Sequence, residues 1–306
     1  MSRCLVTGGA GFIGSHIVDA LVAAGHETTV FDNLSTGRRD QVNGAARFVG
    51  GSVCDLAALE QCFATGRFEV VYHLAAQTDV MTSVDDPYSD AEHNILGGIR
   101  VLECCRRNEV RKIIYSSSSA VFGEPDYLPM DEVHPVRPIC PYAASKHTFE
   151  HYLEIARIIH GLDYTVLRYA NAYGPRQDPH HEGGVVAIFA HKLLNGIRPT
   201  IYGDGQQTRD FVHVDDLVRA NLGCLDRAGG ESLNLGTGIE VTVTALYEQL
   251  AAMASVDFEP ERRAERKGEM RRLSLDSRRA GEVLDWRPNV RLVEGLGSVL
   301  AHFRES

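Results

Sequence analysis

Short apolar runs alternate with longer stretches of helical period along most of this chain. The first apolar run, Cys4-Leu5-Val6, is too short for a helix and leads into three glycines. In the stretch 15–24 the apolar side chains fall on one stripe, at Ile17, Val18, Leu21 and Val22. A short apolar run predicts a strand, and recurrence every three or four residues predicts a helix. The chain therefore opens as a strand, a glycine turn and a helix.

The same alternation continues to the end of the chain. Further strands are predicted at 28–31, 48–53, 69–76, 112–115, 164–169, 199–202 and 232–235. Further helices are predicted at 56–63, 91–107, 142–160, 185–194, 243–253 and 293–303. A strand and then a helix are predicted within 211–225, with Asp215 and Asp216 as caps of that helix. Strands that alternate with helices predict an α/β fold with a parallel, doubly wound sheet of the Rossmann kind.

A change of composition predicts where this sheet ends and a second unit begins. After Gly174-Pro175 the chain becomes rich in Pro, His, Gly and Asp. We expect a first domain over 1–174, to which 211–237 return. We expect 175–210 and 238–306 to form a second, smaller α/β domain.

The glycines of the first turn suggest a dinucleotide site. Gly8, Gly11 and Gly14 lie between a strand and a helix, where a tight turn, close approach to a pyrophosphate and helix packing each require glycine. Asp32 ends the second strand about twenty residues on, where such folds place an acid that binds the ribose diol. Its carboxylate would repel a 2′-phosphate, which favours NAD over NADP, although Arg38 and Arg39 could soften that preference.

Two residues at the start of the helix at 142–160 could perform acid–base chemistry. Tyr142 and Lys146 are four residues apart, so both side chains leave one face of one turn. A nearby ammonium and a positive nicotinamide would lower the pKa of a phenol from about 10 toward neutrality, which makes tyrosinate a general base. A hydroxyl at the end of the fifth strand would hold the reacting oxygen. Ser118 is our candidate within the run 116–119, whose spacing alone leaves the choice among four serines open.

Composition and charge narrow the class of protein. The chain has 306 residues, of which 44% are apolar and 24% charged, as in an ordinary enzyme. A formal charge of −10 argues against a nucleic-acid partner, and no run of membrane-spanning length or signal peptide is evident. Seven cysteines without paired metal spacing predict reduced thiols in a cytoplasmic protein and no metal site.

Together these motifs resemble the extended short-chain dehydrogenase/reductases, and within them the UDP-glucose 4-epimerase type of the NAD-dependent epimerase/dehydratase family. The likeness covers essentially the whole chain. It rests on the segments 7–14, 32–37, 74–76, 167–176, 202–205, 208–211 and 234–238, together with Ser118, Tyr142 and Lys146. Several ordered motifs are more specific than any one of them.

The resemblance implies that the domain of 1–174 and 211–237 binds NAD and that the smaller domain of 175–210 and 238–306 binds a nucleotide-sugar. It also assigns roles to single residues by position. Cofactor contacts would come from Gly8, Gly11, Phe12, Ile13, Asp32, Asn33, Ser35, Thr36, Gly37, Asp55, Leu74, Ala75, Ala76, Asn94, Tyr142, Lys146 and Tyr169. Contacts to a UDP-sugar would come from Ser118, Asn171, Val185, Val186, Tyr202, Arg209, Arg266 and Leu273. Arg209 and Arg266 would clasp the diphosphate, since a guanidinium fork matches phosphate oxygens in pairs.

Two positions depart from related patterns. Dehydratases of this family carry an acidic pair after the serine, whereas this chain has Ser119 and Ala120. Leu273 occupies the position that limits bulk at C2 of the sugar and is smaller than an aromatic residue, so an N-acetyl group could fit.

The resemblance implies a C4 epimerase of a UDP-hexose that uses NAD and a 4-keto intermediate. A UDP-glucuronate 4-epimerase, an NDP-sugar dehydrogenase or reductase, and a catalytically silent NAD-binding homologue are the alternatives. The broad apolar surface of the helix at 142–160 further predicts a homodimer, formed through that helix and the one at 91–107.

Overall fold

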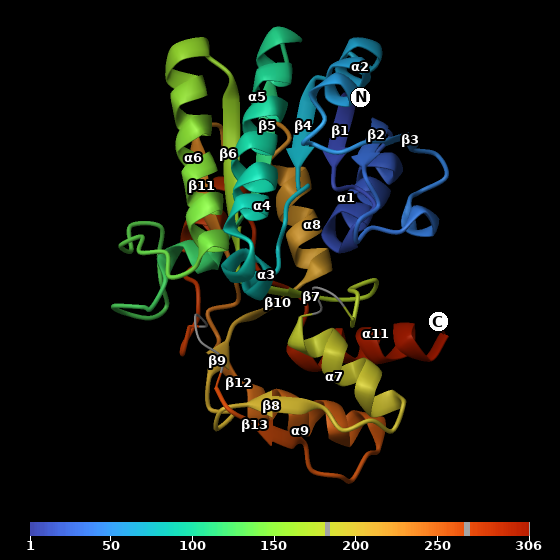
Figure 1. The fold of residues 1–306 in the computed structure, drawn as a ribbon, viewed down its shortest axis with the longest axis vertical. Helices are drawn as coiled ribbons and strands as arrows, with labels where there is room; N and C mark the ends of the chain where they lie inside the picture. The colour runs from blue at the N-terminus through green and yellow to red at the C-terminus, as the bar shows by residue number, and fades with distance from the viewer. Residues whose placement is uncertain (181–183, 266–269, 306) are drawn as a thin grey trace.

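The central element of the fold is a parallel sheet. The structure, a computed structural model, describes residues 1–180, 184–265 and 270–305. Within them, seven strands form the sheet in the order β11-β6-β5-β4-β1-β2-β3 (Figure 1). They are β1 (Arg3–Thr7), β2 (Glu27–Asp32), β3 (Arg47–Gly50), β4 (Val70–His73), β5 (Lys112–Ser118), β6 (Asp163–Tyr169) and β11 (Glu231–Leu235). Every pair of neighbours is parallel, which confirms the predicted fold class.

Helices cover both faces of this sheet, which explains why its strands are so uniformly apolar. On one face, α1 (Phe12–Ala23) and α8 (Val214–Gly223) contribute Ile17, Leu21 and Leu217 to a buried cluster. On the other, Phe149 and Val101 belong to a second cluster. That face carries α2 (Leu56–Gly66), α5 (Gly98–Arg107) and α6 (Pro141–His160). Between β4 and α5 the chain forms α3 (Val80–Asp85), α4 (Pro87–Ala91) and the π-helix η2 (Glu92–Gly97).

A smaller group of elements lies beyond the carboxyl ends of the strands (Figure 1). It comprises α7 (Val185–Leu194), α9 (Val243–Ala254), α11 (Leu292–Glu305) and the strands β8 (Thr200–Tyr202) and β13 (Glu261–Arg263). A third hydrophobic cluster, with Phe189, Leu246 and Val299, packs these helices together. The remaining elements are β7 (Asn171–Tyr173), β9 (Thr208–Arg209), β10 (Phe211–His213), β12 (Val241–Thr242), α10 (Arg278–Leu284), η1 (Arg39–Gln41) and η3 (Ser119–Phe122).

The predicted cap of α8 is wrong. His213, not Asp215 or Asp216, is the N-cap, and its ring accepts a hydrogen bond from the Asp215 backbone N–H. Asp216 is instead buried, and its carboxylate accepts from the backbone N–H groups of Asn289 and Val290 at 3.1 Å each. That carboxylate thus fixes the segment before α11 rather than the end of its own helix.

Candidate active site

The glycine turn after β1 brings three segments into close contact. Gly8 has φ +71°, and a Cβ there would lie 2.7 Å from the backbone nitrogen of Ala75. A Cβ at Gly14 would lie 2.2 Å from the Gly8 oxygen. The turn ends at Gly11, the N-cap of α1, where no side chain caps the helix. Uncapped N–H groups at a helix N-terminus are suited to bind an anion such as a pyrophosphate.

The end of β4 is shaped by the same turn. The predicted strand at 69–76 stops at His73, because the N–H groups of Leu74 and Ala75 both turn to the Thr7 backbone oxygen, at 3.1 and 3.0 Å. The Leu74-Ala75 segment thereby lies directly beside Gly8.

Asp32 ends β2 and supports the turn from the other side. Its side chain is buried, with Oδ2 accepting from the Ala10 N–H at 2.9 Å and Oδ1 from the Leu34 N–H at 2.8 Å. The carboxylate therefore joins the loop after β2 to the glycine turn while it forms part of the cavity wall.

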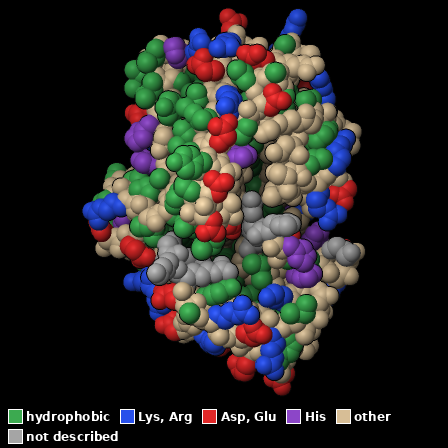
Figure 2. Space-filling model, in the orientation of Figure 1, with side chains coloured by type: hydrophobic (Ala, Val, Ile, Leu, Met, Phe, Trp, Pro, Cys, Tyr) green, Lys and Arg blue, Asp and Glu red, His purple; other side chains and the backbone are tan. Residues whose placement is uncertain are grey.

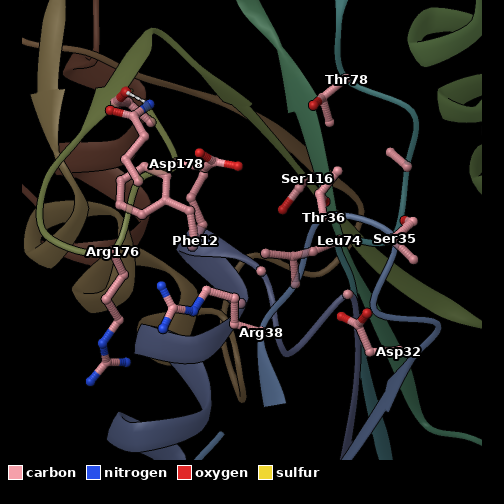
Figure 3. A pocket seen from close by; sticks show the side chains of 18 of the residues that line it. Phe12, Asp32, Ser35, Thr36, Arg38, Leu74, Thr78, Ser116, Arg176 and Asp178 are labelled. Atoms are coloured by element: carbon pink, nitrogen blue, oxygen red, sulfur yellow. Dashed lines mark hydrogen bonds between the residues drawn. The ribbon is translucent and has the colours of Figure 1, made fainter. Parts of the chain in front are cut away.

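A cavity of about 840 Å³ opens at the carboxyl ends of the strands. Its volume is within the range of ligand sites. In Figure 3, Asp32, Thr36, Leu74 and Ser116 lie on one side of it, and Phe12, Arg38, Arg176 and Asp178 on the other. It brings together many predicted residues, namely Gly8, Gly11, Phe12, Ile13, Asp32, Asn33, Ser35, Thr36, Leu74, Ala75, Ala76, Ser118, Tyr142, Lys146 and Tyr169.

Lys146 and Tyr142 lie together in the wall of this cavity. The ammonium of Lys146, a side chain that is 3% exposed, is 5.9 Å from the centre of the Tyr142 ring and 5.0 Å from that of Tyr115. It donates to the backbone oxygen of Ser116 at 2.9 Å. A buried cation at this distance stabilises the ionised form of a phenol.

The serines at the end of β5 have different partners. Ser116 donates to the Tyr169 hydroxyl at 3.0 Å, and Ser117 donates to Glu150 at 2.6 Å. Ser118 Oγ accepts from the Ala120 N–H at 3.2 Å, so its own proton remains available for donation. Of these three cavity-lining serines, Ser118 is the last residue of the strand.

Beneath the cavity lies a histidine that sequence reasoning placed only in a strand. His73 Nδ1 is 2.8 Å from Thr7 Oγ1, and its ring stacks on Tyr115. Burial, and then the charge of Lys146, lower the pKa of His73 to about 3. The imidazole is therefore neutral near pH 7 and does not compete with Lys146 as a cation.

Several lining residues were not assigned from the sequence. They include Gln41, Thr78, His93, Gln177, His180, His191, Asn195 and His302. Burial, and then the Arg176 charge, lower the pKa of His302. These side chains come from loops and from the helices η1, η2, α7 and α11. They lie outside the glycine and Tyr/Lys motifs, and no local pattern marks them.

Three predicted cofactor residues serve other contacts. Asn94, buried in η2, donates to Gln77 O, Asp90 and Ser145 and accepts from the Gln77 N–H. Asp55 caps α2 through the Ala58 N–H at 3.1 Å. Gly37 packs against Ala10. None of these three residues is among the described residues that line the cavity. Their contact with a cofactor stays a prediction.

Of the predicted sugar-binding residues, Ser118 lines this cavity, whereas five others do not. Asn171 is in β7, Val185 and Val186 begin α7, Tyr202 ends β8, and Arg209 in β9 donates to the Thr208 and Met270 backbone oxygens at 2.8 Å each. None of them is among the described residues of its wall. Arg266 lies outside the described residues.

Leu273 is placed in the core rather than in the cavity. Its side chain is 2% exposed and belongs to the cluster around Met130 and Leu275. The segment is held there because the Met130 N–H donates to the Ser274 oxygen at 2.8 Å. The structure therefore does not bring Leu273 to the cavity, and its role as a steric gate stays a prediction.

The described part of the chain has neither a metal-ligand cluster nor a membrane-spanning helix. No cluster of three or more His, Cys, Asp or Glu side chains is arranged to hold a metal ion. No helix there is both long enough and apolar enough to cross a membrane.

Comparisons with known proteins agree with this geometry. A family model described as the NAD dependent epimerase/dehydratase family matches residues 4–236. The UDP-glucose 4-epimerase of Mycolicibacterium smegmatis is 45% identical over 309 residues, covering 99% of this chain and 98% of the relative.

Two solved structures are similar over nearly their whole length. The UDP-glucose 4-epimerase of Thermotoga maritima, with UDP-glucose, has a TM-score of 0.97 at 45% identity, covering 99% of this chain and 98% of that one. The Thermus thermophilus UDP-glucose 4-epimerase complex with NAD has a TM-score of 0.95 at 42% identity, covering 99% of each chain.

Proposed function

The chain belongs to the NAD dependent epimerase/dehydratase family, and on that premise we propose that it is an NAD-dependent 4-epimerase of UDP-hexoses. It would interconvert UDP-glucose and UDP-galactose, a step of galactose metabolism. The similar T. maritima enzyme, solved with UDP-glucose, supports the substrate class. The observation that carries the proposal is the contact of Lys146 with the Tyr142 ring in the wall of a dinucleotide-sized cavity.

The residues of the cavity fit NAD. The pyrophosphate would bind at the uncapped N-terminus of α1, where a Cβ at Gly8 would collide with Ala75. Asp32 would bind the adenine ribose, and Lys146 the nicotinamide ribose. When bound, NAD supplies reversible oxidation of the alcohol at C4 of the sugar.

Three side chains would move or hold the proton at the sugar O4. Tyr142 would take that proton as tyrosinate and return it in the second half of the reaction. Lys146 would stabilise the phenolate, and Ser118 would donate a hydrogen bond to O4. Because the sugar would be oxidised at C4 and then reduced again at the same carbon on its opposite face, the product would differ from the substrate only in the configuration at C4.

Dehydration of the sugar lacks a catalyst in this site. At the two positions after Ser118 where dehydratases carry an acidic pair, the chain has Ser119, which is buried, and Ala120. An intact Ser118, Tyr142 and Lys146 also argue against a silent NAD-binding homologue. A UDP-glucuronate epimerase or a dehydrogenase remains the alternative that a substrate panel would detect.

Binding of the UDP portion would fall to the smaller group of elements. Asn171, Val185, Val186, Tyr202, Arg209 and Arg266 would form its cradle, in a domain made of 175–210 and 238–306. Acceptance of UDP-N-acetylhexosamines was inferred from Leu273 alone, whose core position gives no steric support for it. Incubating the purified protein with UDP-N-acetylglucosamine and separating the products tests whether N-acetylhexosamines are accepted.

We further propose that the protein is a homodimer through α5 and α6. Figure 2 shows hydrophobic side chains gathered over these helices. On α6, Tyr152, Ile155, Ile158 and Ile159 are 38%, 48%, 76% and 66% exposed. An exposed apolar face of this extent would be covered if α5 and α6 packed against the same two helices of a second protomer, which would form a four-helix interface.

Seven free cysteines in the chain support a reducing, cytoplasmic location. Six of them are buried and one is half-buried, which is typical of structural thiols. Catalysed interconversion of UDP-glucose and UDP-galactose by the purified protein is the direct test of the proposed function.

A further inference from the structure

Glu150 lies one helical turn beyond Lys146 on α6, and its carboxylate is buried beneath the candidate site. The residue is 6% exposed. Its Oε1 accepts from the Ser117 hydroxyl at 2.6 Å and from Arg168 Nε at 3.1 Å, and its Oε2 accepts from Arg168 Nη2 at 2.7 Å. Burial alone would raise the pKa of Glu150, but hydrogen bonds from His147, Arg168 and Ser117 lower it to about 2. The carboxylate is therefore ionised, and Arg168 holds it with a two-pronged fork.

Glu150 has three side-chain partners: His147 on α6 itself, whose Nδ1 lies 3.0 Å from Oε2, and two that come from neighbouring strands. Ser117 in β5 and Arg168 in β6 stand opposite one another in the sheet. The Arg168 guanidinium also lies 5.0 Å from the centre of the Phe122 ring in η3, the short helix that follows Ser118. One buried ion pair thus joins α6, both strands and the segment after β5.

The contacts of this network lie on both sides of Ser118 in the sequence, at Ser116 and Ser117 before it and at Phe122 after it. On its N-terminal side, β5 is joined to α6 twice: Lys146 Nζ donates to the Ser116 oxygen, and Ser117 donates to Glu150. Along α6, Tyr142, Lys146 and Glu150 follow one another at intervals of four, which puts them on one face of the helix. The separation between Ser118 and the Tyr142–Lys146 turn is therefore set by the contacts of Glu150 and Lys146.

Stability alone does not account for an ion pair in this place. Burying two charges costs solvation free energy that their attraction often fails to offset, and apolar side chains of similar volume are often neutral or stabilising replacements. We propose that Glu150 and Arg168 are positioning residues, which hold Ser118 in register with Tyr142 and Lys146. The proposal rests on the function proposed above for these three residues.

The test replaces the pair as a unit. Glu150→Leu combined with Arg168→Met removes both charges with little change of volume, so no buried charge is left unpaired. We expect an unchanged or raised midpoint of thermal unfolding, together with a fall in kcat on the order of 10- to 100-fold and an unchanged KM, because small displacements of reacting groups slow the chemical step. Arg168→Lys keeps the charge without the fork and should lose less activity. Wild-type kcat in the double variant would overturn the proposal.

Asp216→Asn is the matched control. Asp216 is also a fully buried carboxylate that binds backbone N–H groups and an arginine, Arg219, but it belongs to α8 and is not among the described residues of the cavity wall. This change should lower the unfolding midpoint and leave kcat per folded molecule as in wild type. An equal loss of kcat in this control would show that the effect in the double variant comes from general loosening, against the proposal.

A second readout needs no turnover. The absorbance of each protein is titrated against pH, and the titration curve of the same protein carrying Tyr142→Phe is subtracted. The difference gives the pKa of the Tyr142 phenol. In the double variant this pKa should rise above the wild-type value, because the pair carries no net charge and its loss acts through the position of Lys146. An unchanged phenol pKa in the double variant contradicts the positioning role. This readout remains valid if the wild-type protein turns over no UDP-sugar. Such a lack of turnover would contradict the proposed function and not the positioning role.

Discussion

The side-chain nitrogen of Lys146 lies 2.9 Å from the backbone oxygen of Ser116. This bond joins α6, the helix that carries Tyr142 in its first turn, to β5, the strand that ends with Ser118. The same ammonium faces the Tyr142 ring at 5.9 Å. A single buried cation therefore both holds the site together and stabilises the negative charge that the proposed general base would carry.

Replacing Tyr142 by Phe removes the phenolic oxygen and little else. We expect turnover to fall by about 100-fold or more, because a general base contributes on that order to the rate. Binding of the UDP-sugar, measured by calorimetry, should be unchanged. Near wild-type turnover in the purified variant would exclude Tyr142 as the base.

Replacing Asp32 by Ala should change both cofactor preference and stability. NAD should bind more weakly and NADP should compete, since the carboxylate no longer repels a 2′-phosphate. Loss of the acceptor for the Ala10 and Leu34 N–H groups should cost about 1–3 kcal/mol in the free energy of unfolding. Glu27→Ala, an exposed acid at the other end of β2, is the control and should leave the preference intact. If calorimetry finds the same NAD preference in both variants, another residue sets it.

The low pKa of His73 predicts a loss of stability in mild acid. The imidazole has its ordinary pKa of 6.5 in the unfolded chain and about 3 in the folded protein. Below pH 6.5 the unfolded state therefore binds a proton that the native state does not. The free energy of unfolding should fall by about 1.4 kcal/mol per pH unit from this group as the pH drops toward 3.

His73→Asn isolates this contribution, because asparagine can still pair with Thr7 but does not titrate. Denaturant unfolding of both proteins should give a difference in stability that is constant above pH 6.5 and shrinks below it. A difference that stays constant through mild acid would show that His73 titrates normally in the native state.

The proposed dimer depends on the exposed isoleucines of α6. Ile158→Lys should convert the protein to a monomer, since a charge buried in an apolar interface loses its water without gaining a partner. Val133→Lys is the control, because Val133 is 85% exposed but lies outside α5 and α6. Sedimentation of the two variants distinguishes the cases, and a wild type that is already monomeric at micromolar concentration contradicts the proposal.

Periodicity was sufficient to predict the strands and helices that build the sheet. The apolar runs of β1, β4 and β5 are buried on both faces of the sheet, so their continuous apolar pattern predicted strands. Hydrogen bonds between segments far apart in the sequence were not predictable: β4 ends at His73, where the N–H groups of Leu74 and Ala75 both donate to the Thr7 backbone oxygen. The cap of α8 was missed for the same reason, since the partners of Asp216 lie more than seventy residues away in the sequence.

The cavity was predictable where its residues follow a motif. The backbone geometry of the glycine turn made Gly8 predictable, and the end of the second strand made Asp32 predictable. Helical spacing did the same for Tyr142 and Lys146. Glu150 and Arg168 were not singled out, because each alone looks like an ordinary charged residue. Their pairing depends on α6 packing against β5 and β6, which only the folded chain shows.

The central claim is tested most directly by incubating the purified protein with UDP-galactose and, separately, with UDP-glucose, and by separating the products. We predict that both reactions reach one equilibrium mixture of the two sugars, without growth of the absorbance of reduced nicotinamide. Accumulation of reduced nicotinamide in step with product would identify a dehydrogenase. Conversion of UDP-glucuronate alone, with neither hexose altered, would contradict the hexose assignment and leave the uronate epimerase in its place.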